Sequence, residues 1–223
     1  VILNRASEKD LLELNPEAKY IIHPHPLYDH YGSKMDLIEA RKKLNIPLEK
    51  KVILFFGFIR DYKGLDLLIE SMKDLNDEYL LLIAGEVYGS FKKYDGLIDK
   101  LNIRNKIRLE VRYIPETEIP LFFSASDVCV LPYRTATQSG VVGISYHFDL
   151  PVIVTNTGGL AEMVDKNKTG LIAKEISAES LSKAIKKYFE EGLKNRFIPY
   201  ITDYKTKHSW KSFAERILSL SNH

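Results

Sequence analysis

The sequence has little of what marks secreted, membrane-spanning or nucleic-acid-binding proteins. Its 223 residues include one cysteine, Cys129, so no internal disulfide can form, which fits a reducing compartment. No apolar run approaches the roughly 20 residues of a membrane-spanning helix, and no basic and then apolar segment opens the chain. With a formal net charge of +2, neither nucleic acid nor a membrane surface is indicated as the main partner.

Several motifs that would fix the chemistry are absent as well. No G-x-G-x-x-G follows an apolar strand, which disfavours a dinucleotide cofactor, and no G-x-x-x-x-G-K-[ST] occurs, which excludes a P-loop. The G-x-S-x-G elbow of hydrolases is missing too. His23 and His25 alternate with prolines in a stretch interpreted as a connector, and no cysteine or carboxylate cluster accompanies them. The sequence therefore predicts neither a bound metal nor a cofactor.

What the sequence does contain is a regular alternation of short apolar runs and amphipathic segments. The predicted strands are 52–56, 79–84, 107–111, 128–132, 152–155 and 170–173. The predicted helices between and after them are 65–75, 94–101, 119–126, 141–148, 160–164 and 178–190. Short, wholly apolar strands separated by helices are typical of a parallel sheet covered on both faces. We therefore predict an α/β, Rossmann-like, doubly wound parallel six-stranded sheet in the order 3-2-1-4-5-6.

Three more helices are expected outside this alternation. Ser7 is the expected cap of a helix that runs through Leu14, and Ser33 the expected cap of a helix that ends at Leu44. Residues 209–220 form an amphipathic helix that begins near Trp210.

In such a sheet a ligand binds beyond the carboxyl ends of the strands, where the winding direction reverses. For the predicted order this crevice lies between the loops that follow the first and fourth strands. The first loop is residues 57–64, GFIRDYKG, and the second begins at Tyr133 and ends at Gly140. The topology thus brings a glycine turn with two cations opposite the start of a helix.

The first loop has the residues of an anion site. Arg60 can offer a bidentate fork to phosphate oxygens and Lys63 a point charge, and Gly57 lets the backbone come close to a ligand. Phe58 lies in the same turn. The alternative is that Arg60 and Lys63 are a solvated surface pair around Asp61.

The second loop leads into a helix whose first N–H groups have no partners within the helix. Ser139, Gly140 and Val141 stand where an anion would be cradled by the helix N-terminus. Tyr133 opens the loop as a further donor-binding candidate, and Thr135, Thr137 and Gln138 offer uncharged hydrogen-bonding groups to phosphate or sugar hydroxyls. The alternative is that Gly140, like Gly158 and Gly159, only makes a tight turn.

The loops that follow the other strands are less specific candidates for recognising the base, the ribose or the sugar. Tyr113 and Ile114 can present backbone groups and an apolar wall to a base, and Glu86 can accept from a sugar or ribose hydroxyl. Glu86 is equally a candidate for an exposed helix cap. Glu162 follows a glycine turn and is either a donor-site residue or a carboxylate in the first turn of a helix.

Four stretches together carry a resemblance to a known family: GFIRDYKGLDLLIESM, LLLIAGE, ASDVCVLPY and DLPVIVTNTGGLAEMVDKNKTGLIA. They resemble the C-terminal, donor-binding domain of family 4 glycosyltransferases with the GT-B fold, over roughly residues 50 to 190. The resemblance implies retaining transfer from a nucleotide-activated sugar without a catalytic metal. By motif position it implies that Arg60 and Lys63 bind the diphosphate and are the catalytic groups. It also implies that Ser139, Gly140 and Val141 receive the phosphates.

The chain departs from that family at one motif. Members commonly carry two glutamates eight apart before the Pro-Val strand, and these positions are Ala136 and Ile144 here, in a subgroup with ATQSG at this place. Either Gln138 and its neighbours substitute for them, or donor binding is weakened.

The chain begins with VILN and no methionine, which we interpret as the sign of a fragment. Residues 1–30 are then the remnant of an N-terminal acceptor domain with its connector, 31–205 the nucleotide-sugar-binding domain, and 206–223 a C-terminal helix. The resemblance implies three partners: a nucleotide-sugar donor, a saccharide or glycolipid acceptor for polysaccharide biosynthesis, and the missing domain. We expect weak nucleotide binding and no transfer by the fragment. The expected location is the cytoplasm, or the inner face of a membrane through the missing half.

Two other functions stay open. The vacated glutamate positions favour a non-catalytic nucleotide-binding or interaction module of the same fold. A sugar-nucleotide epimerase of similar architecture would need His and carboxylate groups in the crevice, and Glu162 is the one candidate.

Overall fold

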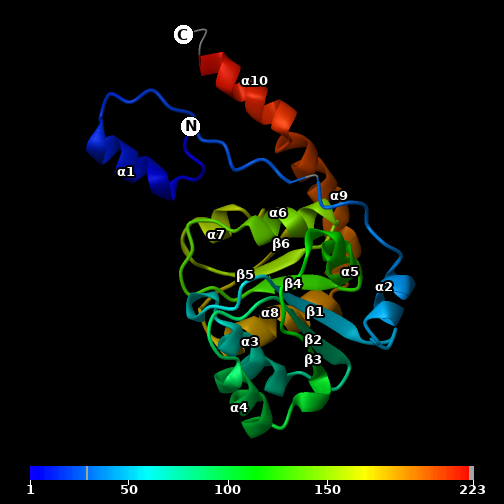
Figure 1. The fold of residues 1–223 in the computed structure, drawn as a ribbon. Coiled ribbons are helices and arrows are strands. Elements are labelled where there is room, and N and C mark those ends of the chain that lie inside the picture. The colour runs from blue at the N-terminus through cyan, green and yellow to red at the C-terminus, as the bar shows by residue number, and fades with distance from the viewer. Residues whose placement is uncertain (29, 221–223) are drawn as a thin grey trace.

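The computed structural model describes residues 1–28 and 30–220, and its centre is a parallel sheet (Figure 1). The six strands run in the order β3-β2-β1-β4-β5-β6, all pairs being parallel. Their bounds are β1 Lys51–Phe56, β2 Tyr79–Ala84, β3 Ile107–Glu110, β4 Val128–Leu131, β5 Val152–Thr155 and β6 Gly170–Ala173. The predicted fold class and strand order are confirmed.

The central strands form because their apolar side chains are covered from both sides. β2 is buried along its whole length, and β1 is buried from Val52 to Phe56. The two strands pair in register from Lys51 with Tyr79 to Phe56 with Ala84. Strands buried on both faces are continuous rather than alternating in hydrophobicity, and that pattern predicted them from the sequence.

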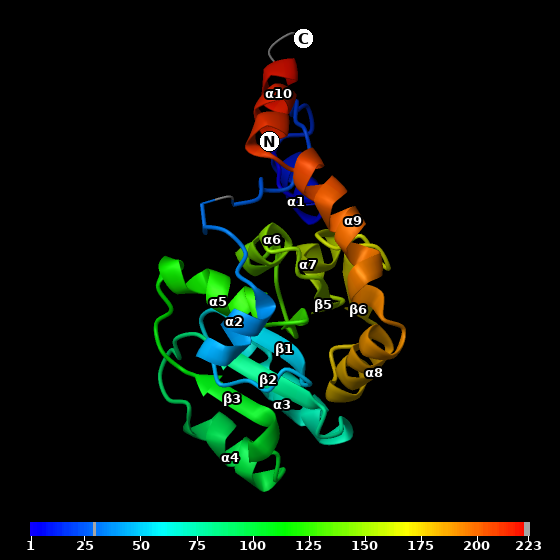
Figure 2. The same cartoon turned by 90° about the vertical axis from the view of Figure 1, so that its right-hand side faces the viewer.

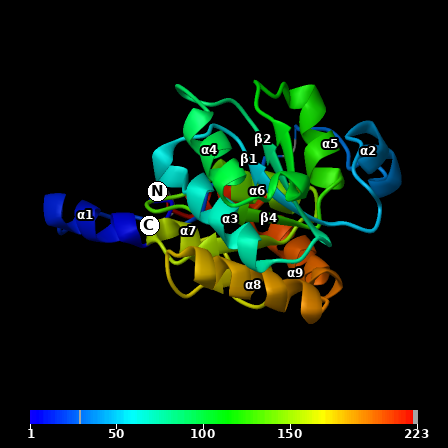
Figure 3. The same ribbon diagram turned by 90° about the horizontal axis from the view of Figure 1, so that it is seen from below.

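Helices cover both faces of the sheet (Figures 1 and 3). One layer consists of α3 Leu65–Ser71, α4 Lys92–Lys100 and α8 Ala178–Glu190. The other contains α2 Leu37–Lys43, α5 Ile119–Ser124 and α6 Gly140–His147, with α9 Leu193–Lys207 packed against α6 and α8. The short helix α7, Gly158–Glu162, follows β5.

At two helices the serine predicted as the N-cap is not the cap. α2 starts at Leu37 and not after Ser33, since the Asp36 carboxylate accepts hydrogen bonds from the N–H groups of Ile38 and Glu39, at 2.9 and 3.0 Å. At α1, Ala6–Leu14, Asn4 Oδ1 accepts from the Ser7 N–H at 2.9 Å, so Ser7 is the donor and not the cap.

The helix α9 was not predicted. It contains Pro199, and Gly192, with φ of 59°, separates it from α8. Its buried side chains are Leu193, Phe197, Ile201 and Tyr204. That spacing follows one helix face and was the available signal.

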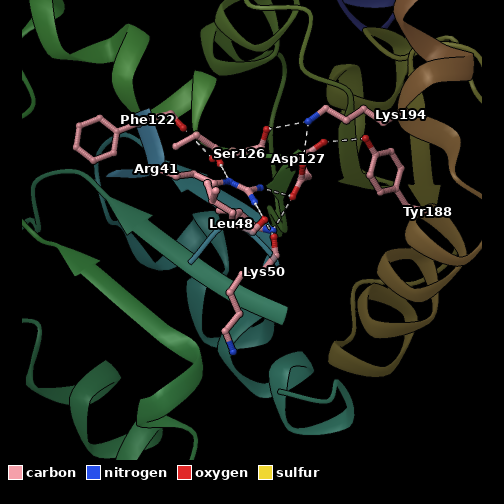
Figure 4. A network of polar contacts seen from close by, with 10 residues as sticks. Arg41, Leu48, Lys50, Phe122, Ser126, Asp127, Tyr188 and Lys194 are labelled. Atoms are coloured by element: carbon pink, nitrogen blue, oxygen red, sulfur yellow. Dashed lines mark hydrogen bonds and ion pairs between the residues drawn. The ribbon is translucent and has the colours of Figure 1, made fainter. Parts of the chain in front are cut away.

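A network of polar contacts around Asp127 joins the layers at the amino ends of β1 and β4 (Figure 4). Arg41 of α2 and Lys194 of α9 pair with its carboxylate at 2.8 and 2.9 Å. The Val52 N–H donates to the same carboxylate at 2.8 Å, and the Tyr188 hydroxyl donates to the Asp127 carbonyl at 2.8 Å. We call these residues the Asp127 network.

Two helices stand out from this body on the side of α6 and α7 (Figures 1 and 2). They are α1 and α10, Trp210–Leu220. Between α1 and α2 runs an extended segment, here called the connector and described for residues 20–28 and 30–36. Within the described part of the chain, no helix combines the length and the apolar character that crossing a bilayer requires.

Candidate functional site

The loops that follow β1 and β4 meet at the carboxyl edge of the sheet, as the topology predicts. The Arg134 N–H donates to the Tyr62 carbonyl at 2.7 Å, and the rings of Tyr62 and Tyr133 lie 6.0 Å apart. A cavity of about 700 Å³ opens where they meet. It is lined by Tyr28, His30, Tyr31, Tyr62, Lys63, Tyr133, Thr135, Ala136, Thr137, Gln138, Ser139, Gly140, Val141 and Ile144.

Lys63 is the one described cation in this lining. It ends the 3-10 turn Asp61–Lys63, its side chain is buried, and its Nζ lies 5.6 Å from the centre of the Tyr133 ring. No hydrogen bond or ion pair reaches this Nζ from residues 1–28 or 30–220. Burial, helped by the charge of Arg60, lowers the pKa of Lys63 to about 8. A buried ammonium without a counter-charge is costly, and an anion in the cavity would offset that cost.

Glycines keep the backbone close to this amine. Gly57 has φ of +94°, and a Cβ there would lie 3.2 Å from Lys63 Nζ. Gly64 follows with φ of +65°, and a Cβ there would lie 2.1 Å from the Pro132 carbonyl oxygen. The first loop can therefore approach the second only with glycine at position 64.

The N-terminus of α6 lies against the same loop. Ser139 is its N-cap, accepting from the Val141 N–H at 3.3 Å, and the Tyr133 hydroxyl lies 3.3 Å from Ser139 Oγ. A Cβ on Gly57 would lie 3.8 Å from Val141 Cγ2, so the helix start is next to Lys63. The Gly140 N–H opens the helix and has no intrahelical acceptor. The helix dipole and the ammonium thus favour negative charge at one place.

The cavity brings together about half of the residues predicted for the site. Those that line it are Lys63, Tyr133, Thr137, Gln138, Ser139, Gly140 and Val141, with Gly57 directly beneath Lys63. Arg60 does not line it. Its side chain is exposed, and the guanidinium lies over the rings of Tyr88 and Phe58, at 5.1 and 5.9 Å from their centres. Arg60 acts on the site through its charge, which lowers the pKa of Lys63.

The remaining predicted residues lie outside the cavity lining. Glu86 is exposed after β2, and Tyr113 is exposed after β3, with Ile114 packed against the core. Glu162 accepts a hydrogen bond from the Arg5 N–H at 2.8 Å and borders a separate cavity of about 180 Å³ with Gln138.

Sequence reasoning missed three residues of the connector that line the cavity: Tyr28, His30 and Tyr31. The dense run of rings in residues 28–31 was the available signal, but nothing in it tells which part of the fold it touches. The positions without the expected glutamates, Ala136 and Ile144, also line the cavity. In the described parts of the chain, no group of three or more His, Cys, Asp or Glu side chains could hold a metal ion.

Residues 36–204 match the model of the family described as glycosyl transferases group 1. The chain belongs to this family. D-inositol 3-phosphate glycosyltransferase of Corynebacterium aurimucosum is 25% identical over 233 aligned residues, which cover 97% of this chain and 55% of that protein. The chain thus spans about half the length of the curated relatives it matches.

Solved structures share the fold of this group 1 domain. Sucrose-phosphate synthase from Thermosynechococcus elongatus superposes with a TM-score of 0.82 at 21% identity, covering 99% of this chain and 57% of that one. The Anabaena protein HepE in complex with UDP superposes with a TM-score of 0.85 at 18% identity, covering 100% and 63%. The predicted GT-B C-terminal domain is confirmed as the fold.

Proposed function

We propose that this chain is the donor-binding part of a glycosyltransferase and holds the diphosphate of a nucleotide-sugar at Lys63 and the start of α6. The observation that carries the proposal is the ammonium of the buried Lys63 side chain, which has no counter-charge in the described chain and lies at a cavity beside a helix N-terminus. Family membership supports it, and so does the neighbouring structure in complex with UDP.

The geometry suits the departure of a nucleoside diphosphate. As the bond to the sugar breaks, negative charge grows on the leaving phosphate oxygens. The Lys63 ammonium and the Gly140 N–H at the start of α6 are already in place, so they stabilise this charge without reorganising. Arg60 adds long-range positive potential from the exposed side of its turn.

Transfer itself needs an acceptor held beside the donor. We propose a saccharide or glycolipid acceptor bound with an N-terminal domain, by analogy with relatives named for inositol phosphate and teichuronic acid glycosyltransferases. Three expectations stay predictions: the domain division at residues 30 and 205, the inactivity of the chain alone, and a cytoplasmic or peripheral membrane location.

The test is the affinity of the chain for UDP and GDP, measured by isothermal titration calorimetry for wild type, Lys63→Ala and Lys73→Ala. Losing a charged hydrogen-bond donor should weaken the preferred nucleotide about 10- to 100-fold in Lys63→Ala. The control Lys73→Ala removes an exposed lysine outside the cavity and should bind like wild type. Equal affinity of wild type and Lys63→Ala would contradict the proposal.

The second candidate is a non-catalytic module of the same fold. The apolar Ala136 and Ile144 in the cavity wall favour it, because neither side chain can accept a hydrogen bond from a ribose or sugar hydroxyl. Absence of binding by every nucleotide and nucleotide-sugar tested would support this alternative. The epimerase alternative loses its candidate, since Glu162 lies outside the cavity lining.

A further inference from the structure

The connector forms one wall of the cavity, and it is held there from two sides. The Leu27 N–H donates to the His208 carbonyl at the end of α9, at 3.0 Å. His147 Nε2, at the end of α6, donates to the Gly32 carbonyl at 2.7 Å. Residues 28, 30 and 31 thus lie between two fixed points.

Small residues on α6 let the connector come close. A Cβ on Gly143 would lie 3.4 Å from Leu27 Cδ2, and one on Gly140 would lie 3.7 Å from Tyr28 Cε2. Gly140 is also the first residue of α6, where the diphosphate is proposed to bind. The Tyr28 ring is therefore next to the anion position.

The rings of this wall do not form a slot for a flat base. Tyr28 lies edge-on to Tyr31 at 5.9 Å and 69°, and edge-on to His30 at 5.6 Å and 86°. His30 and Tyr31 are tilted by 37° at 4.3 Å, too close for a ring to enter between them. Stacking on both sides of a base would need two parallel faces farther apart.

The wall instead suits a pyranose ring, which has apolar C–H faces and a rim of hydroxyls. Apolar surface comes from Ala136, Ile144 and the aromatic rings. Residues that carry hydrogen-bonding groups line the cavity as well: Tyr28, His30, Tyr31, Thr135, Thr137 and Gln138.

We propose that Tyr28, His30 and Tyr31 of the connector form the subsite that holds the glycosyl ring of the donor. This inference rests on the proposed function, because the diphosphate at α6 fixes where the ring begins. The connector, and not α6 alone, then selects the sugar.

The experiment measures how much the sugar adds to nucleotide affinity. Titration calorimetry gives Kd for UDP, UDP-glucose, UDP-N-acetylglucosamine, GDP and GDP-mannose on wild type, Tyr28→Phe and His30→Ala. Tyr28→Phe keeps the ring against Gly140 and removes only the hydroxyl. Tyr200→Phe, an exposed tyrosine of α9 outside the cavity, is the control.

For the nucleotide that binds, the ratio of its Kd to that of its sugar conjugate should fall about 3- to 10-fold in each connector variant, as expected for one lost hydrogen bond. Affinity for the nucleotide alone should change less than about twofold, and the control should match wild type. An unchanged ratio, a wild-type ratio near one, or equal loss for nucleotide and conjugate would overturn the subsite.

The same titrations separate this inference from the proposed function. Loss of nucleotide affinity in Lys63→Ala with an unchanged sugar ratio in the connector variants means that only the subsite is wrong. Nucleotide binding that does not depend on Lys63, or no binding of any probe, means that the proposed function is wrong and the subsite with it.

Discussion

Lys63 shows how one residue can serve binding at the expense of stability. Its side chain is buried, and the ammonium lies beside Gly57 and the Tyr133 ring with no carboxylate against it in the described chain. A hydrocarbon side chain of similar length would satisfy the same space without the desolvation cost. The residue is thus destabilising in the absence of a ligand, as binding-site residues often are.

We expect Lys63→Met to unfold at higher denaturant concentration than wild type at pH 7, with a gain of about 2–3 kcal/mol. The folded protein binds this proton more weakly than the unfolded chain, because burial lowers the pKa of Lys63 to about 8. The cost is therefore fully present below pH 8 and is relieved as pH rises from about 8 toward the ordinary lysine pKa. Urea unfolding of both proteins between pH 7 and 10 should show the difference shrinking as pH rises. A difference that grows with pH, or a destabilised variant, would contradict this account.

Site residues were predictable where the strand order alone determines their place. They were less predictable where the direction of the side chain determines whether a residue reaches the cavity. Lys63 and Ser139 share a cavity because both follow neighbouring strands in the doubly wound order. Arg60 lies in the same turn, yet its guanidinium stacks on Phe58 and Tyr88 outside the cavity. The connector residues precede the sheet and are distant in sequence from α6. Only their tertiary packing against Gly140 and Gly143 shows where they lie.

At the scale of elements, the strands were predictable because they are continuous apolar runs buried on both faces. Helix ends were less so, since several polar residues compete for the cap and Asp36 prevails over Ser33. α9 was not predicted, although four side chains of one face are buried; the helix continues through Pro199. Tertiary contact overrides local propensity there.

The start of α3 depends on Gly64, which is its N-cap and packs against the backbone at the end of β4. Gly64→Ala should lower the free energy of unfolding by at least about 2 kcal/mol, because a left-handed residue becomes strained and its Cβ meets the Pro132 carbonyl. The shifted loop should also weaken nucleotide binding by moving Lys63. The matched control is Gly96→Ala within α4, where a Cβ meets nothing within 4 Å. It should be stabilised by up to about 1 kcal/mol. Thermal unfolding by circular dichroism distinguishes the two, and equal melting temperatures would contradict the argument.

For the whole molecule, the Asp127 network holds both helical layers to the sheet. Asp127→Ala should cost about 3–5 kcal/mol, because Arg41 stays buried without its counter-charge and the Val52 N–H loses its acceptor. Asp203→Ala, which breaks an exposed pair with Lys207 within α9, should cost less than about 0.5 kcal/mol. Chemical denaturation measures both, and a loss of under 1 kcal/mol in Asp127→Ala would show that the network is dispensable.

Asp127 and Lys50 immediately precede β4 and β1, while the ligand loops immediately follow these strands. The Asp127 network therefore holds the amino edge of the sheet, and the ligand cavity opens at the carboxyl edge. Substitutions of cavity-lining side chains can therefore change substrate preference while the sheet and its helices keep their arrangement. Divergence of specificity within one architecture then becomes a matter of changing cavity-lining side chains, while backbone contacts such as that of the Arg134 N–H with the Tyr62 carbonyl hold the loops in place.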